Sequence, residues 1–599
     1  MTCVKIFKKD WGEGIALALC AGTVAAVLAF LFAPIVWKLA QRTLFLADFE
    51  GLRELLSSRA LPGGLLDWLS RGCQVMGLGS CAWLLHGLVA AGTISLWWCV
   101  FARERKGLGI VLAFPAVLLP LFPPLLAGEE LWLLDDPAAG FRNTFGLWVA
   151  LGVYAGARRL PRGGTALVAI VLFPWFGIYP ILGAMAASVW CWPLVAVPAL
   201  FSVFYYDDMS FETVYLGSGA VLDQLRLCSL NCWNVGAFLC FFLATMINRH
   251  ETDVFVRALA EKMPARLRFS LALPRRVAVM VGVALVLVGG LWASRPNPDF
   301  RGQLERERAV VEGRWEDVLT AKPRNGKALR MESAYRILAL SRLGLLPEQL
   351  FDEPIWSSHE SVDRRDEEAM DAYELLFAYG LLLPARRNLF NVMTRKDWKP
   401  RHFLVLGDIA FLSKENALAE RNYTQLLRCP FYRGIARSRL ALLQAPNPHL
   451  HLPPDLARIA ALAQVVNAML AHNGVVFIDG QQNAEQLIYN YFMNVTNGDA
   501  ETVKFGLACL LLKKKHDRLA FCRNLLEGFY GRPSAVPISL QQALLVSEKC
   551  STEMVLSAVQ QQAMAYRDDA KRFSSKQMDE SLFISRWAST YFFYNEFVK

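Results

Sequence analysis

The character of this sequence changes near Ser294, and that change limits the fold more than any other feature. Before Ser294, long apolar runs are separated by short charged loops. After it, the sequence is charged and amphipathic, and no apolar run is long enough to cross a membrane. We therefore expect a multi-pass transmembrane domain over residues 1–294 and a soluble domain over residues 295–599, joined at the proline-rich junction from Arg295 to Pro298.

Composition agrees with a chain that is partly embedded in lipid. Of its 599 residues, 54% are hydrophobic, and the formal net charge is +10. Many lysines and arginines flank apolar segments, so the positive charge indicates membrane topology rather than a nucleic-acid partner. The 13 cysteines form no CxxC pair and no Cys/His cluster. The sequence therefore predicts no metal site and no cofactor, and it leaves the redox compartment open.

Seven apolar stretches are candidate membrane spans. Lys5, Lys8 and Lys9 precede the first of them, which places the N-terminus in the cytoplasm. The fifth stretch has 40 residues, about twice the length that a bilayer requires. It is either a tight hairpin of two helices or a broken, re-entrant segment, so we expect about 7–9 spans in all. The stretches are Gly14–Trp37, Cys73–Ala102, Gly107–Gly128, Asn143–Ala157, Thr165–Phe204, Cys232–Ile247 and Val277–Ala293.

Charged loops predict which side of the membrane each segment faces. The loops at 103–106 and 158–162 are basic and should be cytoplasmic, whereas the loop at 129–136 is acidic and should face outward. The strongly basic loop at 249–276 should also be cytoplasmic, which places the C-terminal domain in the periplasm. A hairpin at Thr165–Phe204 would instead place that domain in the cytoplasm. Either arrangement predicts an integral protein of the inner membrane.

The first outer loop, residues 38–72, contains the candidate site residues. Asp48 and Glu50 follow the first span closely, and two short amphipathic helices that should lie at the membrane interface come after them. A carboxylate at this position could act as the essential acid of a polytopic glycosyltransferase, in which case Asp48 is the first candidate and Glu50 the second. The alternative is that both are solvated acids at a helix end. His86, within the second span, is a further intramembrane polar group.

The soluble half shows a helical repeat. Turn glycines at Gly313, Gly344 and Gly380 lie 31 and 36 residues apart, and Glu415 follows 35 residues later. A period near 34 is typical of tetratricopeptide repeats, in which two antiparallel helices meet at a small-residue turn. The predicted fold class is therefore all-α: a polytopic helical bundle followed by a tetratricopeptide-like α-solenoid, whose concave face suits an extended partner.

Several segments together resemble a known family. They are the loop from Pro62 to Asp67, the stretch from Glu312 to Leu319, the Gly344–Pro347 turn and the aromatic run Tyr591–Tyr594, which should form the last helix. With the N-terminal anchor and the further spans, the chain resembles an uncharacterised family of multi-pass membrane proteins with helical-repeat tails, found in Bacteroidota. The resemblance covers most of the chain, and it implies no activity.

Two functions from different classes fit these observations. The first is a membrane-anchored scaffold of the cell envelope, whose helical repeats bind a protein or peptide. The second is a polytopic transferase that acts on a lipid-linked sugar, with Asp48 as its essential acid. No nucleotide-binding loop or catalytic triad is recognisable in the sequence. Whether the protein is an enzyme stays open at this stage.

Overall fold

The structure of the chain is a computed structural model, and the text below concerns the residues that it describes. These are residues 2–31, 33–48, 62–79, 81–101, 139–206, 238–245, 298–320, 330–353, 372–395, 398–473, 484–495, 499–521, 523–547 and 554–598, with five isolated positions at 53, 113, 116, 214 and 355.

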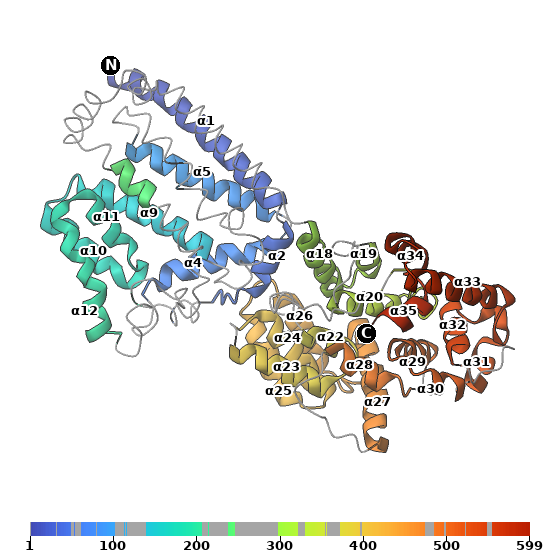
Figure 1. Cartoon of the computed structure of the whole chain (residues 1–599). Coiled ribbons are helices and arrows are strands. Elements are labelled where there is room, and N and C mark those ends of the chain that lie inside the picture. Colours follow the sequence, from blue (N-terminus) through green and yellow to red (C-terminus); the bar gives the residue numbers. More distant parts are fainter. Residues whose placement is uncertain are drawn as a thin grey trace. The chain divides into compact units, whose positions relative to one another are not determined.

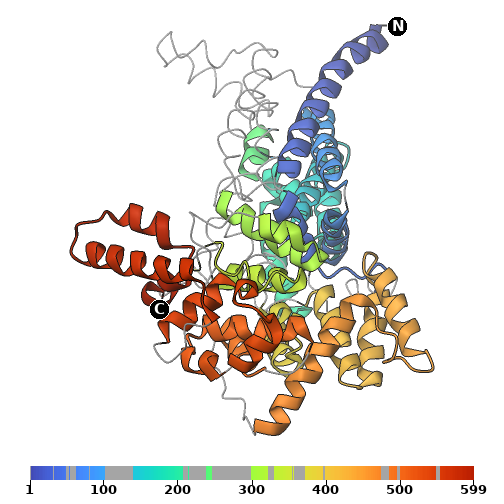
Figure 2. The same cartoon turned by 90° about the vertical axis from the view of Figure 1, so that its right-hand side faces the viewer.

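All regular secondary structure in the described residues is helical, which confirms the predicted all-α class. The chain forms two compact units (Figures 1 and 2). Unit 1 consists of Met1–Asn297 together with two short segments, Trp398–Arg401 and Gln425–Ile435. Unit 2 consists of Pro298–Asp397, His402–Thr424 and Ala436–Lys599.

Unit 1 is built from apolar helices of unequal length. Among the described residues, one helix, α5, is long and apolar enough to cross a membrane, and about half of that segment is buried within the protein. The helices of this unit are α1 (Thr2–Leu31), α2 (Ala33–Arg42), α4 (Gly64–Val75), η1 (Met76–Leu78), α5 (Ala82–Phe101), α9 (Ala139–Ala157), α10 (Arg162–Phe176), α11 (Tyr179–Ala187), η4 (Val189–Ala196) and α12 (Val197–Phe204).

Helices α1 and α5 lie side by side and approach closely at glycines (Figure 1). A Cβ atom added to Gly22 would lie 2.9 Å from the carbonyl oxygen of Gly87, and one added to Gly87 would lie 2.8 Å from the oxygen of Gly22. Ala26 and Ala91 flank the crossing on either helix. Each helix thus presents a pair of small residues four positions apart. Such pairs let two helix backbones pack closely, and the contact needs no hydrogen bond between side chains.

The start of the second predicted span differs from the structure. Nearly all of the first span, Gly14–Trp37, lies in α1 and α2, and residue 32 between these helices lies outside the described residues. The second span, Cys73–Ala102, is divided, since Gly79 adopts an extended conformation between η1 and α5.

The 40-residue stretch Thr165–Phe204 is a broken segment rather than two full helices. Helix α10 ends before Gly177, whose φ of 65° interrupts the helix, and α11 ends before the extended residue Ser188. The pieces α10, α11, η4 and α12 pack around a common apolar core that includes Phe173 and Ile181. Of the other predicted spans, Asn143–Ala157 lies within α9, residues 238–245 of Cys232–Ile247 are helical, and nearly all of Gly107–Gly128 and the whole of Val277–Ala293 lie outside the described residues.

Unit 2 is a succession of short helices joined by tight turns (Figure 2). Its helices in the described residues are α18 (Pro298–Glu312), α19 (Trp315–Thr320), α20 (Arg330–Arg342), α22 (Ala372–Ala378), α23 (Leu382–Arg395), α24 (Pro400–Leu412), α25 (Asn416–Leu427), α26 (Arg433–Leu443), α27 (Pro454–Asn473), α28 (Ala484–Phe492), α29 (Ala500–Leu512), α30 (His516–Phe521), α31 (Arg523–Tyr530), η7 (Pro533–Ala535), α32 (Ile538–Val546), α33 (Ser557–Ser574), α34 (Glu580–Trp587) and α35 (Tyr591–Phe597).

One turn geometry recurs at the ends of these helices. At Gly380, for example, the residue has a φ of 73°, its N–H donates to Phe377 O at 2.9 Å, and the N–H of Leu381 donates to Leu376 O at 3.0 Å. This pair of bonds defines the Schellman motif, which satisfies the last carbonyls of a helix. In the described part of unit 2 the motif occurs at Gly313, Gly344, Gly380, Lys414, Lys514 and Lys576.

The spacing of these turns agrees with the sequence period, with one correction. The first four lie 31, 36 and 34 residues apart. The fourth is centred on Lys414 and not on Glu415, because Lys414 adopts the left-handed conformation with a φ of 64° while the N–H of Glu415 makes the longer-range bond to Ala410 O. A lysine in this conformation is strained by about 1–2 kcal/mol relative to glycine. The turn positions were therefore predicted to within one residue.

The helices of unit 2 do not contact in simple nearest-neighbour order. Tyr379, after α22, stacks on Phe505 of α29 with 4.7 Å between ring centroids. Phe351, after α20, packs against Tyr591 and Tyr594 of α35 at 5.5 and 5.2 Å. In an open solenoid each repeat contacts only its neighbours along the chain. Unit 2 thus has contacts beyond those of an open solenoid, because the buried C-terminal aromatic helix α35 packs on Phe351.

Candidate functional sites

Asp48, the first candidate from the sequence, is held by an arginine far along the chain. Arg428, in the 425–435 segment of unit 1, donates from Nε to Asp48 Oδ2 at 2.6 Å and from Nη2 to Oδ1 at 3.2 Å. The backbone N–H of Ala47 donates to Arg428 O at 3.1 Å. Both carboxylate oxygens therefore accept bonds from one guanidinium, a bidentate geometry that fixes orientation as well as charge. Glu50, the second candidate, lies outside the described residues.

The segment that carries Asp48 is itself attached to α4. Trp68 donates from Nε1 to Leu46 O at 3.2 Å, and Arg71 donates from Nη1 to Leu44 O at 3.5 Å. The ring of Phe45 lies against Trp68 with 5.4 Å between centroids. Residues 43–48 thus connect α4 on one side with Arg428 on the other. This arrangement gives Asp48 a structural role that neither sequence interpretation included.

Asp48→Arg is expected to expose the neighbouring thiol of Cys429. That side chain is buried, and burial raises its pKa to about 12, so the thiol is protonated and unreactive at neutral pH. Two facing arginines would repel each other and separate the segments, water would reach Cys429, and its pKa would fall towards the ordinary value. We expect labelling by N-ethylmaleimide at pH 7.5 to become at least about tenfold faster, as measured by peptide mass mapping.

The matched control for this experiment reverses the pair. Asp48→Arg combined with Arg428→Asp should restore protection of Cys429, while the exposed thiol of Cys81 reports equal reagent activity in every sample. Unchanged labelling of Cys429 in Asp48→Arg would show that the ion pair does not hold the segment in place.

A second acid, Asp67, lies within unit 1 among basic and polar side chains. It stands in the first turn of α4, and its side chain is 8% exposed. Arg71, one turn later, places Nε 2.8 Å from Asp67 Oδ2. Arg142 of α9 places Nη1 3.5 Å from the other oxygen, Oδ1. Each carboxylate oxygen therefore faces a different guanidinium, and the two arginines come from two different helices.

Tight backbone contacts bring α11 to the same region. The hydroxyl of Tyr179, at the start of α11, donates to Asn143 Oδ1 at 2.5 Å, and Asn143 follows Arg142 in α9. Gly63, just before α4, donates from its N–H to Pro174 O at 2.9 Å. Gly63 and Gly177 both have positive φ, of 94° and 65°, and a Cβ on Gly63 would lie 3.4 Å from the nitrogen of Gly177. These glycines allow the break between α10 and α11 to lie against the start of α4.

His86 is buried beside α9 and makes a bond within its own helix. Its Nδ1 lies 3.0 Å from the carbonyl oxygen of Ala82, and its ring packs on Phe141 at 4.9 Å between centroids. Within the described residues, no three His, Cys, Asp or Glu side chains gather as a metal site would require. The described polar chemistry of unit 1 therefore includes two ionic sites, the Asp48–Arg428 pair and Asp67 with its two arginines.

Sequence reasoning did not identify the Asp67 cluster. The Asp67–Arg71 pair was readable, because residues four apart face the same side of a helix. This segment was expected to be an interfacial helix, and Asp48, which precedes it, was taken as the candidate acid in place of Asp67. Arg142 gave no usable signal, since nothing in the sequence indicates that the start of α9 lies beside α4.

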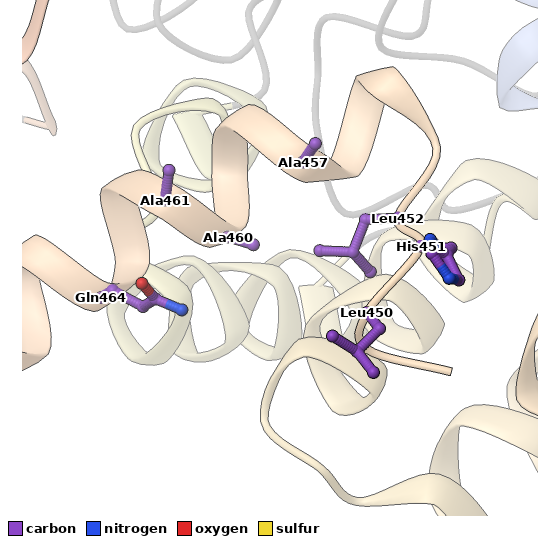
Figure 3. A pocket seen from close by; sticks show the side chains of 7 residues that line it. All are labelled: Leu450, His451, Leu452, Ala457, Ala460, Ala461 and Gln464. Atoms are coloured by element: carbon purple, nitrogen blue, oxygen red, sulfur yellow. The ribbon is translucent and has the colours of Figure 1, made fainter. Parts of the chain in front are cut away.

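Unit 2 contains a shallow groove beside α27 with a volume of about 470 Å³. Figure 3 shows the side chains of Ala457, Ala460, Ala461 and Gln464 along α27, with Leu450, His451 and Leu452 on the preceding loop. Leu450 is 71% exposed, which is unusual for a large apolar side chain. Because the alanine side chains of α27 are small, a bound chain could come close to the backbone of this helix. The groove thus has a mixed lining, in which leucine and alanine side chains lie beside the polar side chains of His451 and Gln464.

Near this groove, four helices are joined by an ionic network in which Arg439 and Asp408 are buried and the Asp455 side chain is 60% exposed. Arg439 of α26 donates from Nε to Asp408 Oδ1 of α24 at 2.9 Å and also binds Asp455 of α27. Tyr423 of α25 donates its hydroxyl to Asp408 Oδ1 at 2.7 Å. Burial and the Asp408 carboxylate raise the pKa of Tyr423 well above its ordinary value, so the hydroxyl keeps its proton. The network fixes the start of α27, where the groove lies.

Together the fold and these sites define an all-α protein with an apolar helical unit and a second unit of helix pairs that end in a repeated turn. Residues 8–598 match a family of unknown function, DUF6057, and the chain belongs to this family. Neither the curated proteins nor the solved structures contain a match to the chain.

Proposed function

We propose that this protein is a multi-pass membrane protein of the bacterial inner membrane whose helical second unit binds a protein or peptide partner at the cell envelope. In this proposal the N-terminus is cytoplasmic and unit 2 is periplasmic. The predicted 7–9 spans and the Bacteroidota origin of the family are part of the same proposal. The groove beside α27 is the observation on which the binding role depends.

Membrane insertion is supported by the surface of unit 1. Large apolar side chains are exposed on α1, α5, α10 and the η4–α12 segment. Helix α5 meets the length and hydropathy of a span. The glycine contact between α1 and α5 is a packing mode common between helices in lipid. Examples of the exposed side chains are Leu19, Phe30, Leu88, Leu167, Trp190, Val203 and Phe204.

Partner binding is supported by the chemistry of the groove. The exposed Leu450 and the small side chains of Ala457 and Ala461 form an apolar strip that a helix or extended peptide could cover. The repeated Schellman turns support a tetratricopeptide-like construction for this unit. Such helical arrays commonly present grooves to peptides, whereas the contacts of Phe351 with α35 make this unit more closed than a solenoid.

The transferase alternative receives no support from the geometry at Asp48. A general base needs an available carboxylate oxygen near its substrate, and both oxygens of Asp48 accept bonds from Arg428. A complementation assay decides between the two. The scaffold predicts that Asp48→Asn keeps function and normal abundance, because the amide still accepts a bond from Arg428. Loss of function at normal abundance would favour the transferase.

Site-specific crosslinking in cells tests the binding role. A photoreactive residue at Ala461, in the groove, should give one discrete protein adduct, and the same residue at the exposed Ser438 of α26 should give none. Leu450→Asp should abolish the Ala461 adduct and reduce complementation, because it places a charge on the apolar surface. Equal adducts at both positions, or full function of Leu450→Asp, would contradict the proposal. Phosphatase fusions at Phe300 and after Lys599 should be active if unit 2 is periplasmic.

A further inference from the structure

The turn between α25 and α26 exposes an aromatic side chain beside the start of α5. Phe431, in the 425–435 segment of unit 1, is 50% exposed. A Cβ atom added to Gly79 would lie 4.0 Å from Phe431 Cε1. Helix α5 begins three residues after Gly79, at Ala82. The ring of Phe431 therefore lies at the N-terminal end of a helix that is long and apolar enough to cross a membrane.

Hydrogen bonds hold this turn in place. Arg428, just before it, binds both carboxylate oxygens of Asp48. Within the turn, the N–H of Tyr432 donates to Cys429 O at 3.1 Å. The ring of Phe431 is thus held at the surface of unit 1, where contact with an apolar phase would lower its free energy.

Further apolar side chains are exposed around the same junction. Met76 lies in η1 just before Gly79, and Trp83 and Leu84 lie in the first turn of α5. Leu88 is exposed on the same face of α5 as Leu84, because residues four apart face the same side of a helix. We call Met76, Trp83, Leu84 and Phe431 the α5-start patch. The patch continues into the exposed apolar face of α5, which lipid covers in the proposed function.

The chemistry of the turn indicates the depth at which lipid would meet this patch. Backbone N–H and C=O groups outside helices do not face lipid within the hydrocarbon region of a bilayer. Arg433 and Arg437 of α26, which follow Phe431 in the chain, are exposed. Their charge complements lipid phosphates, and large apolar and aromatic side chains beside basic ones are typical of the boundary between headgroups and acyl chains. Both features favour the headgroup level over the bilayer interior.

We propose that the α5-start patch contacts a phospholipid bilayer at the boundary between headgroups and acyl chains, so that the 425–435 segment lies on the membrane surface beside α5. Arg433 and Arg437 then stand at the level of the lipid phosphates. The partner of this surface is the bilayer itself. The inference rests on the proposed membrane insertion of unit 1, and it is independent of the groove beside α27.

The test uses the full-length wild-type protein in liposomes of phosphatidylethanolamine and phosphatidylglycerol. The liposomes contain a trace of one of two photoactivatable phosphatidylcholines, with a diazirine either next to the glycerol or half-way along an acyl chain. Labelled peptides are identified by mass spectrometry. Leu88 reports insertion of α5, and Phe390 of α23 is the matched control, because it is a phenylalanine of unit 2 with a similar exposure of 46%.

We expect the glycerol-proximal probe to label the peptide of Phe431 at least about fivefold more than the peptide of Phe390, because burial of half a phenylalanine side chain favours contact by about that factor. The mid-chain probe should label Leu88. Labelling of Leu88 without labelling of Phe431 would overturn the patch and leave membrane insertion standing. Labelling of Phe431 by the mid-chain probe alone would overturn the headgroup depth. Absence of labelling at Leu88 would overturn both this inference and the proposed insertion.

A pair of variants tests whether the ring itself makes the contact. Phe431→Asp should lower glycerol-proximal labelling of the peptide that carries residue 431 by about fivefold or more. Labelling of Leu88 should stay unchanged in this variant, and Phe390→Asp should label like the wild type at both places. Equal labelling of this peptide in Phe431→Asp and the wild type would show that the exposed phenylalanine does not hold the segment on the bilayer.

Discussion

Replacing Arg439 with methionine is expected to destabilise the α24–α27 region of unit 2 by about 3–5 kcal/mol. Arg439 is almost fully buried and pairs with Asp408, whose side chain is 6% exposed. Although burial opposes its charge, the carboxylates of Asp408 and Asp455 raise the pKa of Arg439. Without the arginine, Asp408 would lose the charge-assisted bond from Arg439 Nε while staying buried, and the loss of this attraction is the main source of the destabilisation.

Hydrogen exchange of the full chain in detergent measures this effect locally. Amides of α24–α27 should exchange about two-hundredfold to five-thousandfold faster in Arg439→Met, because local opening becomes easier by the same free energy.

Two variants separate the charge effect from lost packing. Arg437→Met changes an exposed arginine two positions away in α26 and should exchange like the wild type. Adding Asp408→Asn to Arg439→Met should recover much of the stability, because the amide can still accept the hydroxyl of Tyr423 without carrying a charge. Equal destabilisation by Arg437→Met and Arg439→Met would show that the network has no special role.

Local signals in the sequence predicted local structure well. Gly313, Gly344 and Gly380 were assigned to turns, and each adopts a left-handed conformation at a helix end. Glycine is readable there because it alone has no Cβ penalty at positive φ. Lys514 and Lys576 close their helices in the same way, but lysine is common on helix surfaces and carries no turn signal. The all-helical class followed from the same periodicity.

Contacts between distant segments could not be predicted. Asp48 and Asp67 both stand near helix ends in the same loop, and pattern reasoning selected Asp48 because it follows the first span. The deciding partner of Asp48, Arg428, lies 380 residues away. Phe351 likewise gives no indication that it packs on the last helix. Such pairings depend on the tertiary arrangement, which a single sequence records only indirectly.

Gly380→Ala is expected to destabilise unit 2 by about 2–5 kcal/mol, clearly more than Gly344→Ala. Both glycines end a helix in the same Schellman turn, with φ of 73° and 70°. A Cβ on Gly380 would lie 2.5 Å from the backbone nitrogen of Ala463 in α27, whereas a Cβ on Gly344 would have nothing within 4 Å. Backbone cannot move aside as a side chain does, so the first substitution forces α27 away.

Comparing Gly380→Ala with Gly344→Ala separates the cost of the close approach to α27 from the cost of conformational strain. Gly344→Ala should lose only about 1–2 kcal/mol, the strain of a left-handed residue with a Cβ. Lys414 supports this estimate, since the chain already accepts a side chain in the equivalent turn. Pulse proteolysis of the full chain across a urea series gives both values. Equal losses in the two variants would mean that α27 does not lie against the Gly380 turn in solution. A larger loss of stability in Gly380→Ala than in Gly344→Ala would show that the backbone of α27, the helix that carries the groove, lies against the Gly380 turn.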